Sequence, residues 1–574
     1  MHIQGGTAAS TAHITDTLFI DNDAAADGGA VAASDGVVLW LGNVTFSNNT
    51  AENGGGVCVT RGCEIGASGV NFFDNTAFFL GGGLACSYDN ALNFEGVVAR
   101  GNFAILGGAF DVRDGNNFHF VDAILTGNFA SRGGAVSVEN HNTIRLFNIT
   151  AASNTALDDG GAMQFMYDNV VWINGAVLVA NRAIDGSGGA LFSGLNTVIW
   201  ISHLTAGQNR ARDYGGSICS WANENISVRF STFYNDYSFV GGSFSEIQSM
   251  ECSLDHVRVD SSLSFNGVAG SFQQTDVVAR GVTVVNCMSI ANALGGTGWL
   301  ILDSTLDLSD SIFADNVGRL SGAALYYKAT SALLTVVKMT NVVFLRNIGA
   351  ECGAIFIDNT AAELRNVSFF ENTALHGNGG AACIGDTGAP ASVTFHDAVV
   401  ENNTAPNGNG GGIHIADGST LSLIQTEIAH NYAKHGGGIA STGSASLVLR
   451  EGVSLTWNTA DENGGAMFAD DGGSSIQAHG GTEISFNRAT TGHGGALYLG
   501  EDTRMEAYAQ CQPITVRSTT STGDWNAAQP LLSVVIVAVH NDGSVTPECC
   551  VDSLGMPTNA DKNQILAEGK KRCA

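Results

Sequence analysis

The feature that most constrains this chain is a degenerate internal repeat. A block of the form apolar-x-x-Asn-x-Ala, followed within a few residues by Gly-Gly-Ala-apolar, recurs about every 27 residues over roughly the first 500 residues. Examples are FSNNTAENGGGV from Phe46, LTWNTADENGGAM from Leu455 and ISFNRATTGHGGAL from Ile484. Because 574 residues exceed what one roughly spherical core can organise, the repeat predicts a stacked array.

Short runs of alternating apolar and polar residues lie between the glycine blocks. After Gly134, for example, AVSV is followed by the polar turn ENHN and then by TIRLFNIT. Such alternation, ended by Asn, Asp or Gly, is typical of half-buried strands, and no 3.6-residue period is sustained. Three short strands and three turns per repeat predict an all-β fold, a right-handed parallel β-helix solenoid of about 18 coils and ~85 Å.

The repeat also sets the predicted domain boundaries. We expect the β-helix to cover residues 1–500 and a small cap or Cys/Pro-containing appended segment to cover residues 501–574, because an uncovered solenoid end is an unpaired sheet edge. The second segment holds four of the six prolines and four of the 12 cysteines, so disulfides are expected there. Elsewhere the pattern favours buried thiols that act as small apolar side chains.

An apolar residue and an asparagine three positions later mark each coil. The apolar position, occupied for example by Phe46 and Phe72, predicts an apolar column inside the coil. Asparagine carries both donors and an acceptor, so stacked copies can form a hydrogen-bonded ladder, and it also tolerates a left-handed turn. The predicted structural ladder comprises Asn22, Asn49, Asn75, Asn102, Asn128, Asn154, Asn181, Asn209, Asn235, Asn316, Asn347, Asn372, Asn403, Asn431, Asn458 and Asn487.

The last glycine of each block is expected to be structural as well. A glycine there supplies a positive φ or lets neighbouring coils approach closely. The predicted positions are Gly29, Gly56, Gly83, Gly108, Gly134, Gly161, Gly189, Gly216, Gly242, Gly380, Gly412, Gly438, Gly465 and Gly495.

Charge and hydropathy exclude some partners. The chain has 25 Lys+Arg against 54 Asp+Glu, a formal net charge of −29, which repels nucleic-acid phosphates and anionic membrane surfaces. The longest apolar run, Leu531 to Val539, is too short to cross a bilayer. We therefore predict no nucleic-acid partner and no membrane span in this chain. Since the sequence opens on repeat material without a leader, we expect it to be part of a longer protein.

The paired signatures FxxN and GGA-apolar resemble the polymorphic outer-membrane protein (Pmp) repeat of chlamydial autotransporters. FxxN stands at Phe46–Asn49 and Phe313–Asn316, and GGA-apolar begins at Gly133 and Gly464. The resemblance covers residues 1 to about 500 and gains specificity from the regular spacing of the two motifs. It implies a pectin-lyase-like right-handed β-helix on a cell surface, often serving adhesion.

A polysaccharide lyase or hydrolase of the pectin-lyase-like fold is the alternative. Gly492-His493-Gly494 gives the GHG segment of such enzymes, but inside an ordinary repeat. The carboxylate pairs Asp158-Asp159 and Asp470-Asp471 adjoin glycine pairs, where Asp is a usual turn residue, and acid–base work requires carboxylates held across one bond. The sequence therefore predicts no catalytic residue, and, without a CxxC pair or an acidic partner for His430 and His435, no metal site or cofactor.

These observations favour a non-enzymatic surface or secreted repeat protein that serves adhesion or as a scaffold, because solenoids present long faces for contacts in register. We expect an extracellular or cell-surface location, with the outer membrane as an option for a fragment. We also expect a monomer whose partner is a host or cell-surface protein or a glycan.

Overall fold

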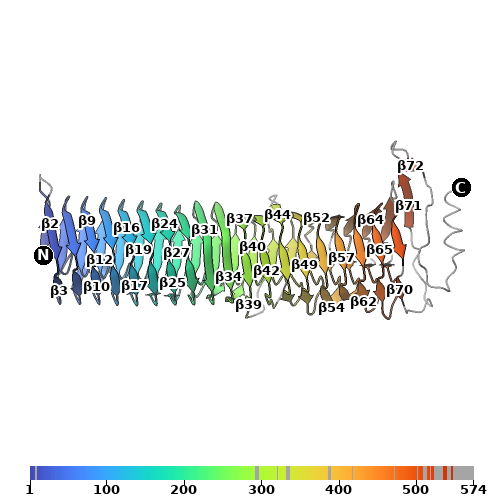
Figure 1. The fold of residues 1–574 in the computed structure, drawn as a ribbon, viewed down its shortest axis with the longest axis horizontal. Coiled ribbons are helices and arrows are strands. Elements are labelled where there is room, and N and C mark those ends of the chain that lie inside the picture. Colours follow the sequence, from blue (N-terminus) through green and yellow to red (C-terminus); the bar gives the residue numbers. More distant parts are fainter. Residues whose placement is uncertain are drawn as a thin grey trace. The chain divides into compact units, whose positions relative to one another are not determined.

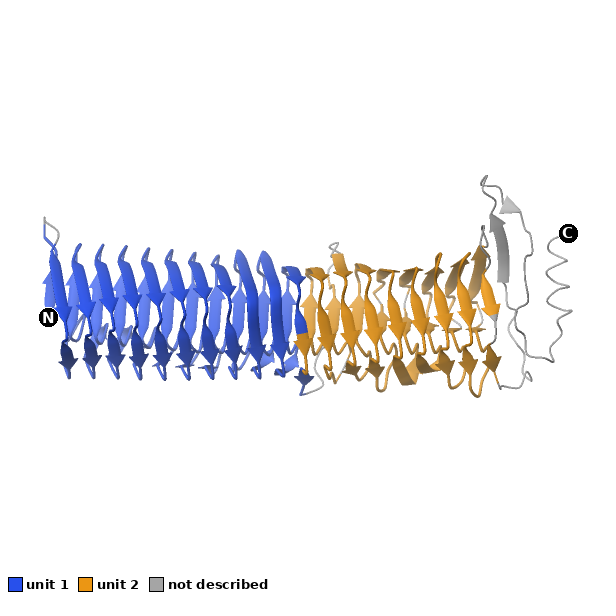
Figure 2. Cartoon of the chain, viewed as in Figure 1, with its two compact units in different colours: residues 1–283, 287–290 blue, residues 284–286, 291–574 orange. Residues whose placement is uncertain are grey.

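The chain folds as parallel β-strands in two compact units, shown in a computed structural model (Figures 1 and 2). Unit 1 comprises residues 1–283 and 287–290, and unit 2 comprises residues 284–286 and 291–574. The structure describes residues 1–6, 10–290, 296–319, 321–330, 336–385, 389–416, 418–470, 472–500, 502–508, 514–517, 519–521, 534–539 and 545–546. The predicted C-terminal segment, 501–574, lies mostly outside these described residues.

One coil of unit 1 contains four short strands. They are β15 (Phe110–Arg113), β16 (Asn117–Val121), β17 (Ile124–Thr126) and β18 (Phe129–Ala130). The next coil repeats them as β19 (Val136–Glu139), β20 (Thr143–Phe147), β21 (Thr150–Ala152) and β22 (Thr155–Ala156), and each strand pairs in parallel with its counterpart. We call the stack of strands like β15 sheet A, that of strands like β16 and β17 sheet B, and that of β18 sheet C.

Unit 2 is built from the same coil. Strands β55 (Ile413–Ile415), β56 (Thr420–Ile424), β57 (Glu427–Ala429) and β58 (Tyr432–His435) are followed by β59 (Ile439–Ser441), β60 (Ser446–Leu449), β61 (Ser454–Thr456) and β62 (Thr459–Ala460). All four pairings between the two coils are again parallel. The described residues contain no helix, and the strands stack as a β-solenoid of about 18 turns, so the predicted all-β fold class is confirmed.

The alternating sequence pattern separates the inside of each coil from its surface. In β16, Phe118 and Phe120 are buried while the residues between and beside them are exposed or half-buried, as expected for a strand with one apolar face. The predicted apolar column lies inside sheet B. Phe46 pairs with Phe72 one coil later, and their rings stack with centroids 5.2 Å apart. In unit 2, Phe344 stacks on Phe369 at 4.9 Å.

Left-handed corners separate the strands of sheets B and C. Asp122 (φ 55°) lies between β16 and β17, and Gly127 (φ 61°) follows β17. The corner after β17 falls on the residue just before the ladder asparagine, as at Asn48 and Ser153. The expectation that the ladder asparagines themselves adopt the left-handed conformation is therefore wrong, because the preceding residue makes the turn and leaves the asparagine side chain pointing inward.

Candidate functional site

The predicted asparagines of unit 1 stack into a buried hydrogen-bonded ladder. The backbone N–H and the side-chain Nδ2 of Asn128 both donate to Oδ1 of Asn154, at 3.0 Å each. The Nδ2 of Asn128 also donates to the carbonyl oxygen of Ala99 in the preceding coil, at 3.1 Å. Each rung thus forms hydrogen bonds with its own side-chain amide and accepts one from the backbone N–H of the preceding rung, which has no carbonyl acceptor. Buried polar groups need such partners.

Each unit contains a ladder of this kind. In unit 1 it includes Asn22, Asn49, Asn75, Asn102, Asn128, Asn154, Asn181 and Asn209. In unit 2 it includes Asn316, Asn347, Asn372, Asn403, Asn431, Asn458 and Asn487.

One predicted rung is wrong. Asn235 is the left-handed corner residue, with φ 53°, and the ladder position belongs to Asp236. The backbone N–H of Asn209 donates to Oδ1 of Asp236 at 3.0 Å, and the N–H of Asp236 meets the hydroxyl of Ser262 at 3.4 Å. The sequence analysis chose Asn235 because it is the asparagine nearest to the expected position, whereas the left-handed corner places the side chain of Asp236 inside the coil.

The glycine turns use two consecutive glycines for two different purposes. The first, such as Gly133 (φ 60°), supplies the left-handed turn, and the second, such as Gly134, lies against the next coil. A Cβ on Gly134 would stand 2.1 Å from the carbonyl oxygen of Gly161. The predicted positions that share this close approach are Gly29, Gly108, Gly134, Gly161, Gly189, Gly216, Gly242, Gly380, Gly465 and Gly495.

Four predicted glycines are one position out of register. Where the sequence reads Gly-Gly-Gly, the last glycine occupies the place that Ala30 or Ala109 takes in other coils, as their matching backbone hydrogen bonds show. A side chain is therefore accommodated at this position, and the close approach falls on the glycine before it. The four are Gly56, Gly83, Gly412 and Gly438.

A second asparagine ladder, which the sequence analysis missed, runs beside the first in unit 1. It comprises Asn90, Asn116, Asn142 and Asn169. The Nδ2 and backbone N–H groups of the first three each donate to Oδ1 of the next member, and Asn169 ends the ladder as an acceptor. Each of these residues stands directly before a strand of sheet B, for example Asn142 before β20. An asparagine directly before a strand, repeated at intervals of 26 or 27 residues, is the sequence pattern that could have predicted this second ladder.

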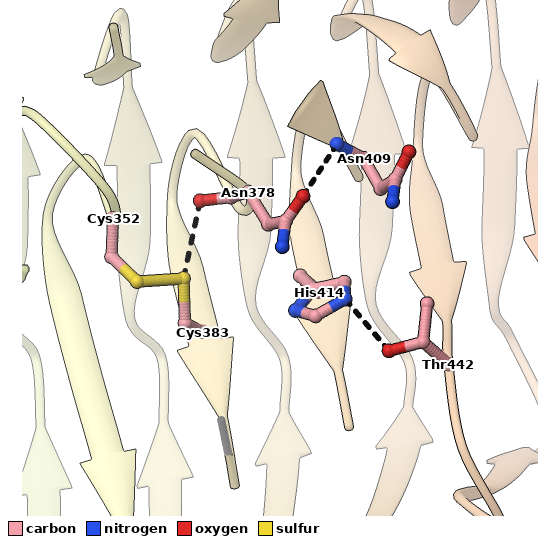
Figure 3. Close-up of a disulfide and its surroundings, with 6 residues drawn as sticks. All are labelled: Cys352, Asn378, Cys383, Asn409, His414 and Thr442. Carbon is pink, nitrogen blue, oxygen red and sulfur yellow. Dashed lines mark hydrogen bonds between the residues drawn. A yellow bond between two sulfur atoms is a disulfide. The ribbon is translucent and has the colours of Figure 1, made fainter. Parts of the chain in front are cut away.

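A disulfide connects neighbouring coils of unit 2 (Figure 3). Cys352 and Cys383 are fully buried, and their Cα atoms lie 5.9 Å apart. The expectation that cysteines outside the C-terminal segment are plain buried thiols is therefore wrong for this pair. Adjacent coils bring residues separated by 31 positions side by side, a proximity that spacing alone does not reveal. The predicted C-terminal disulfide cysteines, Cys511, Cys549, Cys550 and Cys573, lie outside the described residues.

The residues of the enzyme alternative lie in ordinary repeat positions. His493 precedes the left-handed Gly494, and its backbone N–H donates to Oδ1 of Asn463, the corresponding residue one coil earlier. Asp159 stands before Gly160 and accepts from the backbone N–H of Ser187 at 2.8 Å. Asp471 lies outside the described residues. Among the residues that are described, no group of three or more His, Cys, Asp or Glu side chains is arranged to hold a metal ion.

One cluster in unit 1, which the sequence analysis did not predict, combines two carboxylates with an arginine, as a glycan-cleaving site would. The Arg113 guanidinium, on β15, contacts Asp111 at 2.6 Å and Glu139 of the next coil at 3.4 Å. Burial raises the pKa of Asp111 to about 6, although Arg113 opposes the shift. Because the Asp111 side chain has no exposed surface, a bound sugar would not reach it, and the cluster is a structural ion pair.

The outer face of sheet B in unit 1 carries aromatic and polar side chains in one register position. Each of nine strands contributes one residue to this position: β2 (Thr11–Thr15), β5 (Val38–Gly42), β9 (Glu64–Ser68), β13 (Ala91–Glu95), β16, β20, β24 (Val170–Asn174), β28 (Val198–Ser202) and β31 (Asn225–Tyr234). We call this set the outer row: His13, Trp40, Gly66, Asn93, His119, Arg145, Trp172, Trp200 and Ser227.

Tryptophans dominate two parts of the outer row. The Trp172 and Trp200 rings stack with centroids 5.0 Å apart, and the Arg145 guanidinium lies 4.7 Å from the centre of Trp172. Nearer the N-terminus, Trp40 is 46% exposed and lies across Gly66, where a Cβ would come within 2.1 Å of the indole. Trp40 is one of the residues that line an open depression of about 460 Å³. The exposed Trp40 and Trp200 rings can contact an apolar or carbohydrate surface, and the neighbouring polar groups can hydrogen-bond to it.

The fold and its ladders define a parallel β-solenoid repeat protein. Residues 43–60, which include β6 (Thr45–Ser47), the rung Asn49 and the first glycine turn after it, match the family model described as the Chlamydia polymorphic membrane protein repeat. The chain is thus a parallel β-solenoid that carries a repeat of the Pmp type, and that repeat family implies association with a cell surface or outer membrane. No curated protein matches the chain. Among the described residues, no helix has the length and apolarity needed to cross a bilayer.

Proposed function

We propose that this chain is a non-enzymatic surface repeat protein that adheres through the outer row of unit 1. The observation that carries the proposal is the single register position shared on one sheet face by Trp40 (46% exposed), Trp200 (39% exposed) and the half-buried Trp172. Large aromatic side chains supply much of the contact energy at protein interfaces, and a soluble chain has little reason to expose several in one row.

The neighbours of these tryptophans suit a surface ligand that is partly polar. Asn93, Glu95 and His119 line the depression beside Trp40, and Arg145 caps the Trp172–Trp200 stack. Indole rings stack on the C–H faces of sugars as well as on apolar side chains, so a cell-surface protein or a glycan is the proposed partner. With a net charge of −29, the chain favours neutral or basic ligands over acidic ones.

The buried disulfide of unit 2 supports a location outside the reducing cytosol. Disulfides of this structural kind form and persist in secreted and cell-surface proteins. Cys352 and Cys383 are packed with Phe356 and Tyr326, away from solvent and reductant. An extracellular or cell-surface position therefore fits both the chemistry of this pair and the proposed adhesive role.

Binding of the labelled full chain to cultured cells tests the proposal. We expect saturable binding that falls roughly tenfold or more when Trp172→Ala and Trp200→Ser are combined, because central aromatic contacts are often worth more than about 1.4 kcal/mol. The control is Trp457→Ala, which removes a tryptophan of unit 2 that is more exposed (52%) than Trp200 (39%).

The same assay separates the proposed partners. Loss of binding after protease treatment of the cells identifies a protein, and loss after glycosidase treatment identifies a glycan. Wild-type chain that does not bind, or an outer-row variant that binds as well as the Trp457→Ala control, would refute adhesion through this face.

A further inference from the structure

In unit 1 both asparagine ladders give way to other polar side chains: the second already has Thr197 at the position after Asn169, and both have a hydroxyl in the coil of Ser249 and Ser262. The first ladder passes from Asn209 to Asp236 and then to Ser262. On the side of the second ladder, the backbone N–H of Asn223 donates to the hydroxyl of Ser249, and the backbone N–H of Ser249 donates to the hydroxyl of Thr275, at 3.3 Å in each case. Hydroxyl groups are shorter and offer fewer hydrogen bonds than amides, so this segment has weaker rungs than the coils before it.

Asp236 replaces an amide with a fully buried carboxyl. Its Oδ1 accepts from the Asn209 N–H, but Oδ2 has no hydrogen-bond partner among the described residues. The polar groups and the one thiol that surround it are all uncharged: Asn209, Ser217, Ser243, Ser262 and Cys287. An ionised carboxylate at this site has no cation to compensate the loss of water.

Glu246 places a second carboxyl inside the same coil. It lies on β33 (Phe244–Ile247), fully buried, and neither of its oxygens has a hydrogen-bond partner in the described part of the chain. On the neighbouring coils its register partners are Ser220 and Phe272. The groups that face it are the hydroxyls of Ser220 and Ser249 and the thiols of Cys219 and Cys252. None of these carries a positive charge.

We propose that residues 209–275 form a proton-controlled weak segment of unit 1, closed while Asp236 and Glu246 are protonated and opening locally when they ionise. A neutral carboxyl resembles the amide of the other coils, with one acceptor oxygen and one hydroxyl donor. A buried carboxylate loses that donor and gains a charge that no cation balances and that only neighbouring hydroxyl and amide groups offset in part. Opening of the coil, which brings water to both groups, relieves this cost.

The direction of the pH dependence follows from the burial of the two groups. Burial raises the pKa of Asp236 to about 7 and that of Glu246 to about 8, from ordinary values of 3.8 and 4.5. Because these pKa values are higher in the closed state than in the open state, the closed coil holds protons that the open coil releases. Its stability is therefore greatest below about pH 4 and falls as the pH rises to about 7–8.

Hydrogen exchange of the full chain, read by mass spectrometry and corrected for intrinsic rates, tests this inference. Between pH 5.5 and 8.5 we expect the opening constant of segments within residues 236–275 to rise at least about a hundredfold. Residues 70–103, which carry the unbroken rungs Asn75 and Asn102 and no buried carboxyl, serve as the internal reference and should change little.

Two isosteric variants assign the effect. Asp236→Asn restores the residue found at other rungs, and Glu246→Gln makes the second carboxyl permanently neutral. Each should remove part of the pH dependence, and the double variant should abolish it and remain protected at pH 8.5. A wild-type segment whose protection does not change with pH overturns the proposal, as does an undiminished pH response in the Glu246→Gln variant, which leaves the ladder untouched.

Discussion

Two stretches of unit 1 share one backbone coil but differ in what fills its buried polar positions. From Asn49 to Asn209 the rungs are amides that donate and accept between coils, whereas from Asp236 to Ser262 they are a carboxyl and a hydroxyl. Strand pairing remains parallel and in register through both stretches, for example from β31 to β34 (Glu251–Asp260). The backbone ladder therefore sets the fold, and the side-chain ladder sets how firmly each coil is held.

The largest difference between the stretches is expected on removal of a rung. Asn154→Ala leaves the backbone N–H of Asn128 without an acceptor, removes one of the two acceptors of its Nδ2, and leaves the Leu125 carbonyl without a side-chain donor. Each buried, unsatisfied group costs about 1–3 kcal/mol, so the local opening free energy should fall by about 4 kcal/mol. Hydrogen exchange of residues 125–160 measures this loss, and a loss below about 1 kcal/mol would show that the ladder is dispensable.

The glycine turns should not distinguish the two stretches. A Cβ on Gly134 meets the Gly161 carbonyl oxygen at 2.1 Å, and one on Gly242 meets the Val268 carbonyl oxygen at 2.4 Å. Gly134→Ala and Gly242→Ala should each cost about 3 kcal/mol, since the next coil must shift. Thermal unfolding compares the two, with Ala135→Gly as a control at the following position. If only one of the pair is destabilised, the backbone coils are not equivalent.

A rung in the hydroxyl stretch should matter much less. Ser262→Ala removes one long acceptor for the Asp236 N–H and the contact with the Ser243 hydroxyl at 2.6 Å. We expect a loss of about 1 kcal/mol, roughly a quarter of that for Asn154→Ala in the same column. Exchange of residues 236–262 at pH 5.5 measures it, and equal losses at Ser262 and Asn154 would erase the proposed difference.

The smallest effect is expected at exposed rungs. The Nδ2 of Asn53 donates to Asp27 at 3.0 Å in a solvent-exposed position, where water replaces a lost hydrogen bond. Asn53→Ala should therefore change the thermal midpoint by no more than the equivalent of about 0.5 kcal/mol. A loss comparable to that of Asn154→Ala would mean that burial does not determine the value of a rung.

The sequence predicts the coil well because each repeat contributes one residue to each column. Regular spacing was enough to place Phe46 and Phe72 in one column and Asn128 and Asn154 on adjacent rungs. The spacing fails where the nearest asparagine does not occupy the ladder position. Asn235 forms the left-handed corner, and Asp236 lies inside the coil in its place.

Other features depend on contacts that spacing does not encode. The Cys352–Cys383 disulfide, the Arg113–Glu139 ion pair and the outer row each require knowledge of which residues face one another across coils. The second ladder was within reach of the sequence, but its asparagines lie in polar turns, where asparagine is common for other reasons.

Hydrogen exchange of the ladder amides at single-residue resolution tests the central claim most directly. The backbone N–H groups of Asn102, Asn128 and Asn154 have only a side-chain oxygen as acceptor. The account predicts that they exchange as slowly as the sheet amides beside them, and that the Asp236 amide exchanges roughly tenfold faster or more. Exchange of the three asparagine amides at the rate of exposed turns would contradict a solenoid held by its buried ladder.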